Sequence, residues 1–212
     1  SVVALPGGRI VVSLDMTGPG VKHVAGTKGR DPSSGHWLMG KVFVSGDKGQ
    51  KWTWKTDYPF HQAQLLRIGG VLYLLGLAGD FRVMRSTDGG DTWSKPLNFA
   101  LGDGEYVISP ANAVLTKEDV FLALMKRVAG NEQAGTSFAP AILHARQGVD
   151  LANKKAWSLS DAGAPLYEAV SSESLNYYGV GVPSTPAGDA AADRAGDARR
   201  RSAVRLRPIS AT

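Results

Sequence analysis

The sequence predicts an all-β protein of the β-propeller class, and three observations lead to this prediction. The pattern Ser-x-Asp-x-Gly-x-x-Trp occurs twice, at residues 45–52 and 86–93, so that corresponding positions lie 41 residues apart. Short segments of strand-like composition alternate with glycine-containing turns on both sides of these motifs. A repeat of about forty residues is the length of one four-stranded propeller blade.

Each of the two motifs follows a strand-like segment and has the composition of a tight turn. The Asp carboxylate can accept hydrogen bonds from backbone amides further along the turn, the Ser can hold that carboxylate, and the Gly can take a positive φ. The Trp begins the return strand and can place a large apolar ring in the neighbouring layer. The residues concerned are Ser45, Asp47, Gly49 and Trp52 in the first motif and Ser86, Asp88, Gly90 and Trp93 in the second. We expect a structural role for them, the closing of a hairpin.

The remaining elements follow from the alternation of apolar runs and turns. A hairpin spans residues 1–15, and a long polar loop covers residues 16–39 before the first motif. Loops of that length in compact repeats are often functional, although an ordinary surface insertion is the alternative. The expected strands are 1–5, 9–14, 40–44, 52–55, 62–67, 71–77, 81–85, 93–96, two strands within 113–125 around a turn at 117–119, 141–145, and one that begins at Trp157.

The composition divides the chain into two predicted parts. Residues 1–182 form a partial propeller of about three to four blades, with 166–182 opening the fourth. Residues 183–212 form a tail rich in Ala, Arg and Asp, which lacks the apolar side chains needed to offset the entropy of ordering, and we expect it to be disordered. An open set of blades leaves sheet faces uncovered, so self-association through those faces is possible.

The composition also excludes several classes of protein. The net charge is +5, but the tail carries six Arg and three Asp, so the basic character is mostly a property of the tail and we expect no nucleic-acid partner. No apolar run of about 18 residues is present, so we expect no membrane span. There are no cysteines, and the four histidines have no metal-ligand spacing, so we expect neither a metal nor another cofactor.

The paired motif resembles the Asp-box, or bacterial neuraminidase repeat, of the sialidase superfamily. The hairpin 1–15 and the segments 142–146 and 150–157 are also similar to blades of that family, and the resemblance covers roughly residues 1–178. It implies a six-bladed propeller, incomplete here, and an exo-α-sialidase type of glycoside hydrolase with a glycan or sialoside substrate. It further implies an extracellular or periplasmic location, although no signal peptide is visible. In the family, the Asp-boxes lie on the face away from the active site.

The resemblance also implies a set of catalytic groups: three arginines that grip the substrate carboxylate, a Tyr nucleophile activated by a Glu, and an Asp acid/base. The family's Arg-Ile-Pro motif is absent, and neither the other arginines nor the Tyr can be assigned. Asp31, in the loop before the first motif, is our candidate for the acid/base, and a turn-forming Asp before Pro is the alternative. Asp15 is a second candidate, and Glu168 is placed like the Glu that polarises the Tyr.

Three functions therefore remain open at this point. The first is a sialidase-like hydrolase of terminal sugars, whose active site is incomplete in these residues. The second is a non-catalytic Asp-box propeller that serves as a glycan-binding or assembly module. The third is another carbohydrate-active enzyme of the same fold, in which a pair of carboxylates replaces the Tyr.

Overall fold

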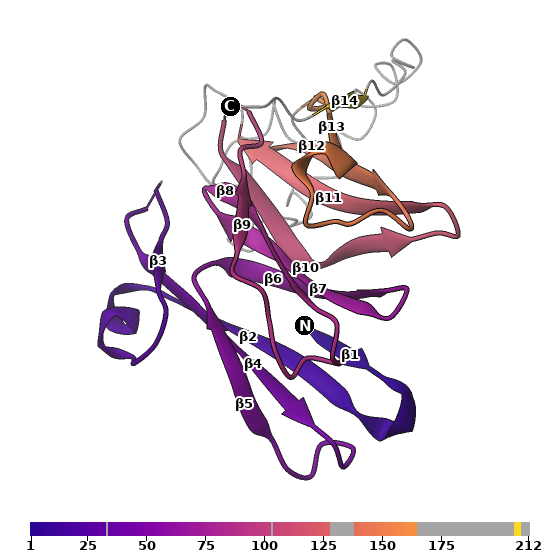
Figure 1. Cartoon of the computed structure of the whole chain (residues 1–212). Helices are drawn as coiled ribbons and strands as arrows, with labels where there is room; N and C mark the ends of the chain where they lie inside the picture. Colours follow the sequence, from indigo (N-terminus) through magenta and orange to yellow (C-terminus); the bar gives the residue numbers. More distant parts are fainter. Residues whose placement is uncertain (33, 103, 128–137, 165–205, 209–212) are drawn as a thin grey trace, which may run out of the picture.

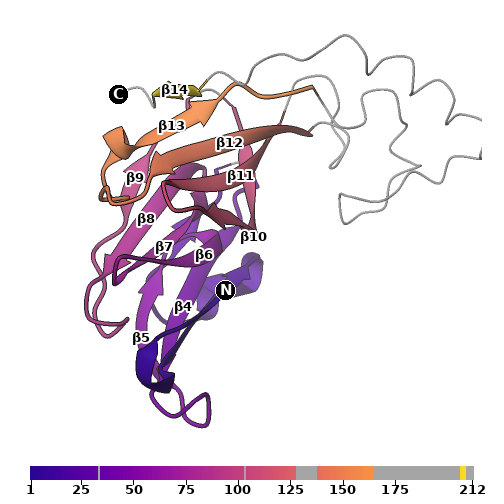
Figure 2. The ribbon, with the colours of Figure 1, turned by 90° about the vertical axis from the view of Figure 1, so that its right-hand side faces the viewer.

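The computed structural model describes residues 1–32, 34–102, 104–127, 138–164 and 206–208. In this part of the chain the regular structure consists of β-strands and three short 3-10 helices, η1 (Pro6–Gly8), η2 (Pro19–His23) and η3 (Lys154–Ala156). The strands form three antiparallel sheets that follow one another along the chain (Figures 1 and 2). The predicted all-β class is confirmed, and successive antiparallel sheets of this kind are the arrangement of propeller blades. The number of blades in a closed ring stays a prediction.

The first sheet has the order β1-β2-β4-β3, with β5 also paired to β4. The second sheet has the order β6-β7-β8-β9, and the third has the order β10-β11-β12-β13-β14. The bounds in the first sheet are β1 Val2–Ala4, β2 Ile10–Thr17, β3 Gly29–Arg30, β4 Trp37–Ser45 and β5 Thr53–Tyr58. The bounds in the second are β6 His61–Ile68, β7 Val71–Ala78, β8 Asp80–Ser86 and β9 Leu97–Phe99. The bounds in the third are β10 Tyr106–Leu115, β11 Asp119–Arg127, β12 Phe138–Arg146, β13 Trp157–Ser160 and β14 Leu206–Pro208.

The second sheet lies between the other two and is covered on both faces. Its central strand β7 is buried at every position after Val71, because alternate side chains enter two different cores. Leu72 and Leu74 pack toward the first sheet, whereas Leu75 and Leu77 pack toward the third. Burying a Leu side chain contributes roughly 1.5–3 kcal/mol, so this one strand supplies a large share of the stability of both interfaces.

The two Ser-x-Asp turns have the same internal hydrogen bonds. In the first, Ser45 Oγ donates to Asp47 Oδ1 at 2.7 Å and accepts from the Gly49 amide at 2.8 Å. In the second, Ser86 Oγ donates to Asp88 Oδ1 at 2.8 Å and accepts from the Gly90 amide at 2.9 Å. The carboxylate of each Asp also accepts the amide four residues further on. The shared geometry explains why both turns need the same three residue types.

The packing predicted for the two tryptophans is found for Trp93 and not for Trp52. Trp52 is 46% exposed, whereas Trp93 packs against the core between the first and second sheets and donates its indole N–H to the Gly90 carbonyl at 3.0 Å. Trp52 has no such neighbour because the first sheet has no described sheet before it. The strand predicted at 93–96 was misplaced, because β9 begins at Leu97. The Ser94 hydroxyl accepts the Arg85 amide, and the Ser94 amide donates to the Arg85 carbonyl, so both backbone groups of Arg85 already have a partner.

The predicted loop 16–39 is shorter and more ordered than expected. Strand β2 continues to Thr17, β4 begins at Trp37, and β3 pairs with the start of β4 between them. Val21 of η2 is buried, which anchors the middle of this excursion to the first sheet. The described residues outside helices and strands are therefore confined to short turns and connections, one of which carries Asp31.

Ion pairs fasten neighbouring sheets along the edge that carries the turns. Asp91 accepts from Arg9 at 2.8 Å and from Lys55 at 2.7 Å, which links the second turn to the first sheet. Arg85 on the second sheet pairs with Asp150, in the loop of the third sheet, at 2.5 Å. These side chains are partly exposed, so each pair contributes only about 0–1 kcal/mol.

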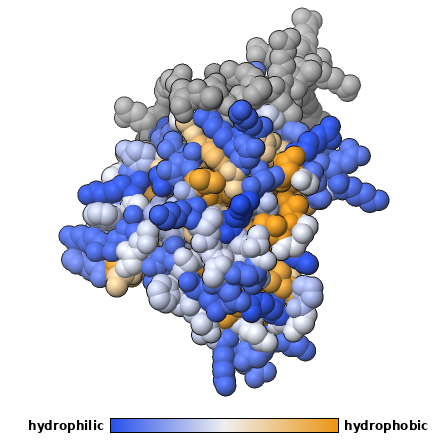
Figure 3. Space-filling view, viewed as in Figure 1, coloured by the Kyte–Doolittle hydropathy of each residue, from blue (hydrophilic) through white to orange (hydrophobic). Residues whose placement is uncertain are grey.

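In the part of the chain that the structure describes, several apolar side chains on the outer face of the first sheet are exposed. Val2, Leu14 and Trp54 expose 64%, 54% and 56% of their surface, respectively. Figure 3 shows apolar patches within a mostly polar surface on the face viewed there. Self-association through such faces stays a prediction. In the described part of the chain, no helix has the length and apolar character of a membrane span.

The division into a propeller and a tail also stays a prediction. Strand β14 comes from the predicted tail and pairs with β13, with Leu206 opposite Ser160. The other residues of the tail, and the segment predicted to open the fourth blade, lie outside the described residues.

Asp88→Asn tests the contribution of the second turn. Hydrogen bonds from Thr92, together with Ser86, lower the pKa of Asp88 from 3.8 to about 2. A carboxylate whose pKa is lowered in the folded state stabilises the fold above its unfolded pKa and loses this effect as the pH falls through the folded pKa. We expect the free energy of unfolding of the variant to be lower by up to about 1 kcal/mol at neutral pH, a small value because the carboxylate is exposed. As the pH falls toward 2, the free energies of unfolding of the two proteins should become similar. Urea denaturation at several pH values measures the difference; a difference that is independent of pH would contradict this account.

Candidate active site

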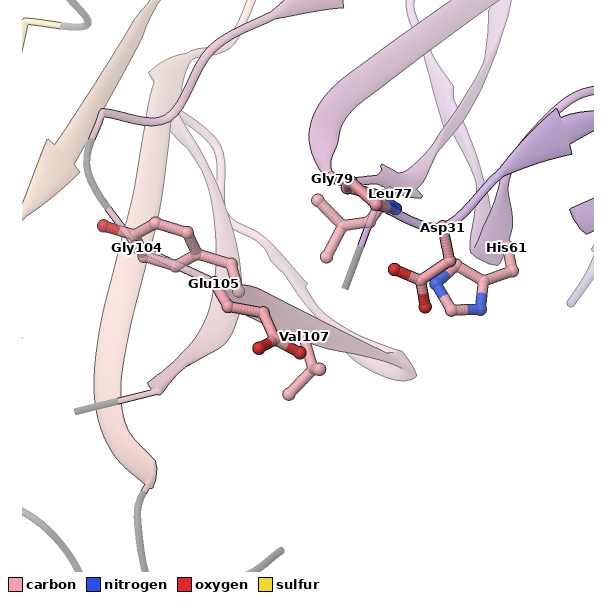
Figure 4. A pocket seen from close by; sticks show the side chains of 9 residues that line it. Asp31, His61, Leu77, Gly79, Gly104, Glu105 and Val107 are labelled. Carbon is pink, nitrogen blue, oxygen red and sulfur yellow. The ribbon is translucent and has the colours of Figure 1, made fainter. Parts of the chain in front are cut away.

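A pocket of about 300 Å³ opens at the edge of the sheets opposite the two turns (Figure 4). Each turn follows the end of the third strand of its sheet, β4 or β8, whereas the pocket residues lie at or before the beginnings of β4, β6, β8 and β10. The walls come from all three sheets. They are formed by Asp31, Pro32, His61, Leu77, Gly79, Gly104, Glu105, Tyr106 and Val107.

Asp31 is held by a tight turn between β3 and β4. Its amide donates to the His36 carbonyl at 2.9 Å, and its carbonyl accepts the Gly35 amide at 2.8 Å. The Ser34 hydroxyl donates to Asp31 Oδ2 at 2.9 Å, which orients the carboxylate. Asp31 therefore has both the turn role and a place on the wall of the pocket, so the two alternatives posed by the sequence are compatible.

The turn with Asp31 rests on Gly79, between β7 and β8. Gly79 has a φ of +80°, and a Cβ atom at this position would lie 2.4 Å from Pro32 Cγ. Glycine is required here both by the positive φ and by the close approach of Pro32. This contact brings the first sheet's loop against the second sheet and closes one side of the pocket.

A bulge at the start of β6 joins the three sheets beneath the pocket. The pairing of β6 with β7 shifts between His61 and Gln64, and Gln62 has a φ of +54°. Gln62 Oε1 accepts the Ile108 amide of β10 at 2.7 Å, and the Ala63 amide donates to Asp15 Oδ2 at 2.8 Å. Positive φ is strained in a residue other than glycine, and such strain and bulges are concentrated near functional sites.

His61 lines the pocket beside Asp31, as Figure 4 shows. Burial lowers the pKa of His61, while the nearby charges of Asp31 and Asp15 act in the opposite direction. The lowered pKa keeps the imidazole neutral at pH 7, because its ordinary value is already below 7. A neutral imidazole can accept a proton at one ring nitrogen and donate one at the other.

The wall across from Asp31 is formed by the start of β10. Glu105 Oε2 lies 2.9 Å from Arg127 Nε. The ring of Tyr106 is buried, and Lys126 Nζ lies 5.8 Å from its centroid. The pocket thus combines two carboxylates, a neutral imidazole and a phenol ring, groups that can transfer protons and bind hydroxyls.

Asp15 lies next to the pocket but has both carboxylate oxygens engaged. Tyr58 Oη donates to Asp15 Oδ1 at 2.5 Å, and the Ala63 amide donates to Oδ2. Burial, with the neighbouring Asp15 charge, raises the pKa of Tyr58 and keeps the phenol protonated as the donor. These contacts give Asp15 a task in holding the first and second sheets together, and a catalytic role for it stays a prediction.

The structure brings Asp31 into a pocket and places the eight residues of the two motifs at the opposite edge. Glu168 lies outside the described residues, so its proposed role stays a prediction. Sequence reasoning gave His61 no functional role and did not select Glu105 or Tyr106. Their positions depend on contacts between sheets, and neither has a motif around it that indicates the pocket.

No family model matches the chain, and no curated protein matches it. Three solved structures have similar folds over part of their length. A protein of unknown function from Dyadobacter fermentans DSM 18053 is 18% identical with a TM-score of 0.42, covering 69% of this chain and 36% of its own. The GH93 α-L-arabinofuranosidase of Fusarium graminearum, in complex with arabinobiose, is 14% identical with a TM-score of 0.45, and the match covers 70% of this chain and 45% of the arabinofuranosidase. An ulvan lyase of polysaccharide lyase family PL25 is 16% identical with a TM-score of 0.47, and the match covers 81% of this chain and 43% of the lyase.

This chain therefore spans less than half of the length of each of these three proteins. The identities and TM-scores are low, so the similarities assign neither a family nor an activity to this chain.

Gly79→Ala tests whether Gly79 positions the Asp31 turn. We expect the free energy of unfolding to fall by about 1–3 kcal/mol, because the new methyl group meets Pro32 and the positive φ becomes strained. Gly70→Ala is the matched control: Gly70 has a φ of +93°, but a Cβ there meets nothing within 4 Å. Urea denaturation and backbone NMR measure both variants. The contact with Pro32 would be unimportant if both variants lost the same free energy of unfolding, or if the amide chemical shifts of residues 30–36 did not change in Gly79→Ala.

Gln62→Gly separates the strain at the bulge from the hydrogen bond to β10. Glycine takes the positive φ freely, which relieves about 1 kcal/mol, while the loss of the bond to the Ile108 amide costs about 1 kcal/mol. We expect little change in global stability but faster hydrogen exchange at Ile108. Exchange measured by NMR at each amide checks this; an Ile108 amide that remains as protected as before would contradict it.

Proposed function

We propose that this chain is part of a carbohydrate-active protein of the glycoside hydrolase type, and that the pocket holds the sugar at the bond to be cleaved. The observation that carries the proposal is the position of Asp31. The resemblance to sialidases implies an acid/base Asp in this loop and an active site opposite the turns. In the structure the Asp31 carboxylate lines a pocket at that edge, with a second carboxylate, Glu105, in the facing wall.

The chemistry of glycosidic bond hydrolysis needs an acid on one side of the bond and a base or nucleophile on the other. In the protonated form, Asp31 would give its proton to the leaving oxygen as the bond to the anomeric carbon breaks. Glu105, which lies beside Arg127, would take a proton from the water that adds to that carbon. His61 is placed to exchange a proton with Asp31 between turnovers. This assignment corresponds to the carboxylate-pair alternative.

The exo-α-sialidase type is a narrower form of the same proposal. It would need arginines that grip the substrate carboxylate and a Tyr nucleophile. Arg127, near the pocket, is engaged by Glu105, so the described residues offer little support for the sialidase type. A glycan substrate also suits the expected extracellular or periplasmic location, which we retain as a proposal.

The second candidate function is a glycan-binding module without catalysis. The observation in its favour is Pro32, an exposed residue of the pocket wall that offers apolar surface to the carbon–hydrogen face of a sugar ring. This candidate would be supported if a glycan binds without being hydrolysed and Asp31→Asn leaves its affinity unchanged.

Asp31→Asn tests the catalytic proposal. The amide keeps the shape of the side chain but cannot donate an acidic proton, so we expect turnover to fall by about 10²–10⁴ while sugar binding is retained. The assay is release of the fluorophore from a panel of glycosides that includes a sialoside, with the full-length protein. Glu118→Gln is the matched control, because Glu118 is 79% exposed and lies in the β10–β11 turn. Turnover equal to that of the unmodified protein would exclude Asp31 as the acid.

A further inference from the structure

We propose that the outer face of the first sheet binds the outer face of the third sheet of a second copy of the chain, so that two copies form a head-to-tail pair. The first and third sheets lie at opposite ends of the stack (Figures 1 and 2). Each copy therefore offers both halves of the contact. The proposed contact involves the faces of the sheets and does not depend on the chemistry of the pocket.

The second sheet shows which residues join one sheet to the sheet before it. Five apolar residues on its side toward the first sheet belong to the shared core or pack against it: Leu65, Leu72, Leu74, Met84 and Trp93. The first four are at most 4% exposed. These positions are therefore the contact positions of a sheet in this fold.

The first sheet repeats these contact residues position by position. The 41-residue repeat and the strand registers give the corresponding residues, in the same order, as Val2, Ile10, Val12, Phe43 and Trp52. For example, Val12 lies opposite Phe43 in the pairing of β2 with β4. Leu74 lies opposite Met84 in the pairing of β7 with β8. All five corresponding residues are apolar, so the first sheet carries the same contact face as the second.

This contact face is accessible in the first sheet. Val2 is 64% exposed and Trp52 is 46% exposed. The excursion between β2 and β4 covers the end of the face near the pocket, where Met39 is buried close to Gly26. Among the described residues, no sheet lies against the half of the face nearer the turns. The apolar positions of that half are therefore available to a partner.

The tryptophans that follow the third strand of each sheet show the same difference. Trp93 packs against the core between the first and second sheets. Trp157 is 1% exposed, and its ring packs edge-on against Phe81 of the second sheet, with the ring centroids 5.2 Å apart. Both rings thus contact the preceding sheet. Trp52 is the exposed member of this series, as expected for a sheet whose preceding neighbour comes from another copy.

The third sheet supplies a matching apolar face. Leu122 and Leu143 enter the core shared with the second sheet. Their chain neighbours Phe121 and Ile142 point to the opposite face, because side chains alternate along a strand. Val114 lies opposite Phe121 in the pairing of β10 with β11 and is 58% exposed. This is the side of a sheet on which the fold adds the next sheet, as the third follows the second.

The number of sheets limits the closed assembly to two copies. A contact between two different faces either closes into a ring or continues as a filament. Propellers close with about four to eight blades, and each copy contributes three sheets. Two copies supply six sheets, which is the only multiple of three in that range. The pair is therefore held by two identical contacts.

Sedimentation equilibrium of the 212-residue chain tests the proposal. Interfaces of standard size have dissociation constants of about 1 μM or tighter, so we expect a dimer at about 100 μM protein. Trp52→Glu places a charge in the first face and Val114→Glu places one in the third. Each should raise the dissociation constant about a hundredfold or more, because an unpaired carboxylate would be buried. Leu97→Glu is the matched control, because Leu97 is 43% exposed on β9 at the edge of the second sheet and should not affect the dimer.

A mixture of the two variants distinguishes a head-to-tail contact from a contact between like faces. Trp52→Glu keeps an unmodified third sheet and Val114→Glu keeps an unmodified first sheet, so a mixed pair has one unmodified contact. We expect the mixture to dimerise about tenfold or more tightly than either variant alone. Circular dichroism verifies folding, and Val2→Glu replaces Trp52→Glu if the latter does not fold.

Several results would overturn the inference. They are a chain that stays monomeric at the highest concentration, a dimer that neither variant weakens, and a closed assembly of more than two copies. A dimer that Trp52→Glu dissociates and Val114→Glu does not would mean that two first sheets face each other, which also contradicts the head-to-tail contact. If another polypeptide or a glycan is the natural occupant of the face, the chain alone stays monomeric and the inference fails.

Discussion

The bulge at residues 61–63 is the constraint on which the arrangement of the three sheets depends. The Ala63 amide reaches Asp15 of the first sheet, and the Gln62 side chain reaches the Ile108 amide of the third. The pairing of β6 with β7 shifts between His61 and Gln64, so the residues of the bulge do not make the hydrogen bonds of a regular ladder. The strain of a positive φ at Gln62 is therefore offset by hydrogen bonds that link the second sheet to both of its neighbours, in addition to the ion pairs along the turn edge.

The same bulge determines what the pocket contains. It directs His61 into the space between the sheets and fixes β10 so that Glu105 and Tyr106 form the facing wall. Gly79 completes the enclosure by letting Pro32, and with it Asp31, approach the second sheet. The pocket is thus a product of the contacts between sheets.

The two edges also use charge differently. Along the turn edge, carboxylates such as Asp91 and Asp150 are paired with cations of the preceding sheet and hold the stack together. In the pocket, Glu105 has a cationic partner behind it, while Asp31 is oriented by the Ser34 hydroxyl and faces the imidazole of His61. Both carboxylates line the cavity at this edge, which is why the proposed chemistry belongs there.

The sequence by itself determined the class of fold, the repeat and most strands, because alternating burial and the Ser-x-Asp turns are local properties that each segment carries alone. It also pointed to Asp31, through the place of the loop relative to the first motif. Only the tertiary structure decided that His61, Glu105 and Tyr106 share a pocket with Asp31 and that β9 starts at Leu97. Those outcomes depend on contacts between residues far apart in the chain, such as Gln62 with Ile108, and no local pattern records such contacts.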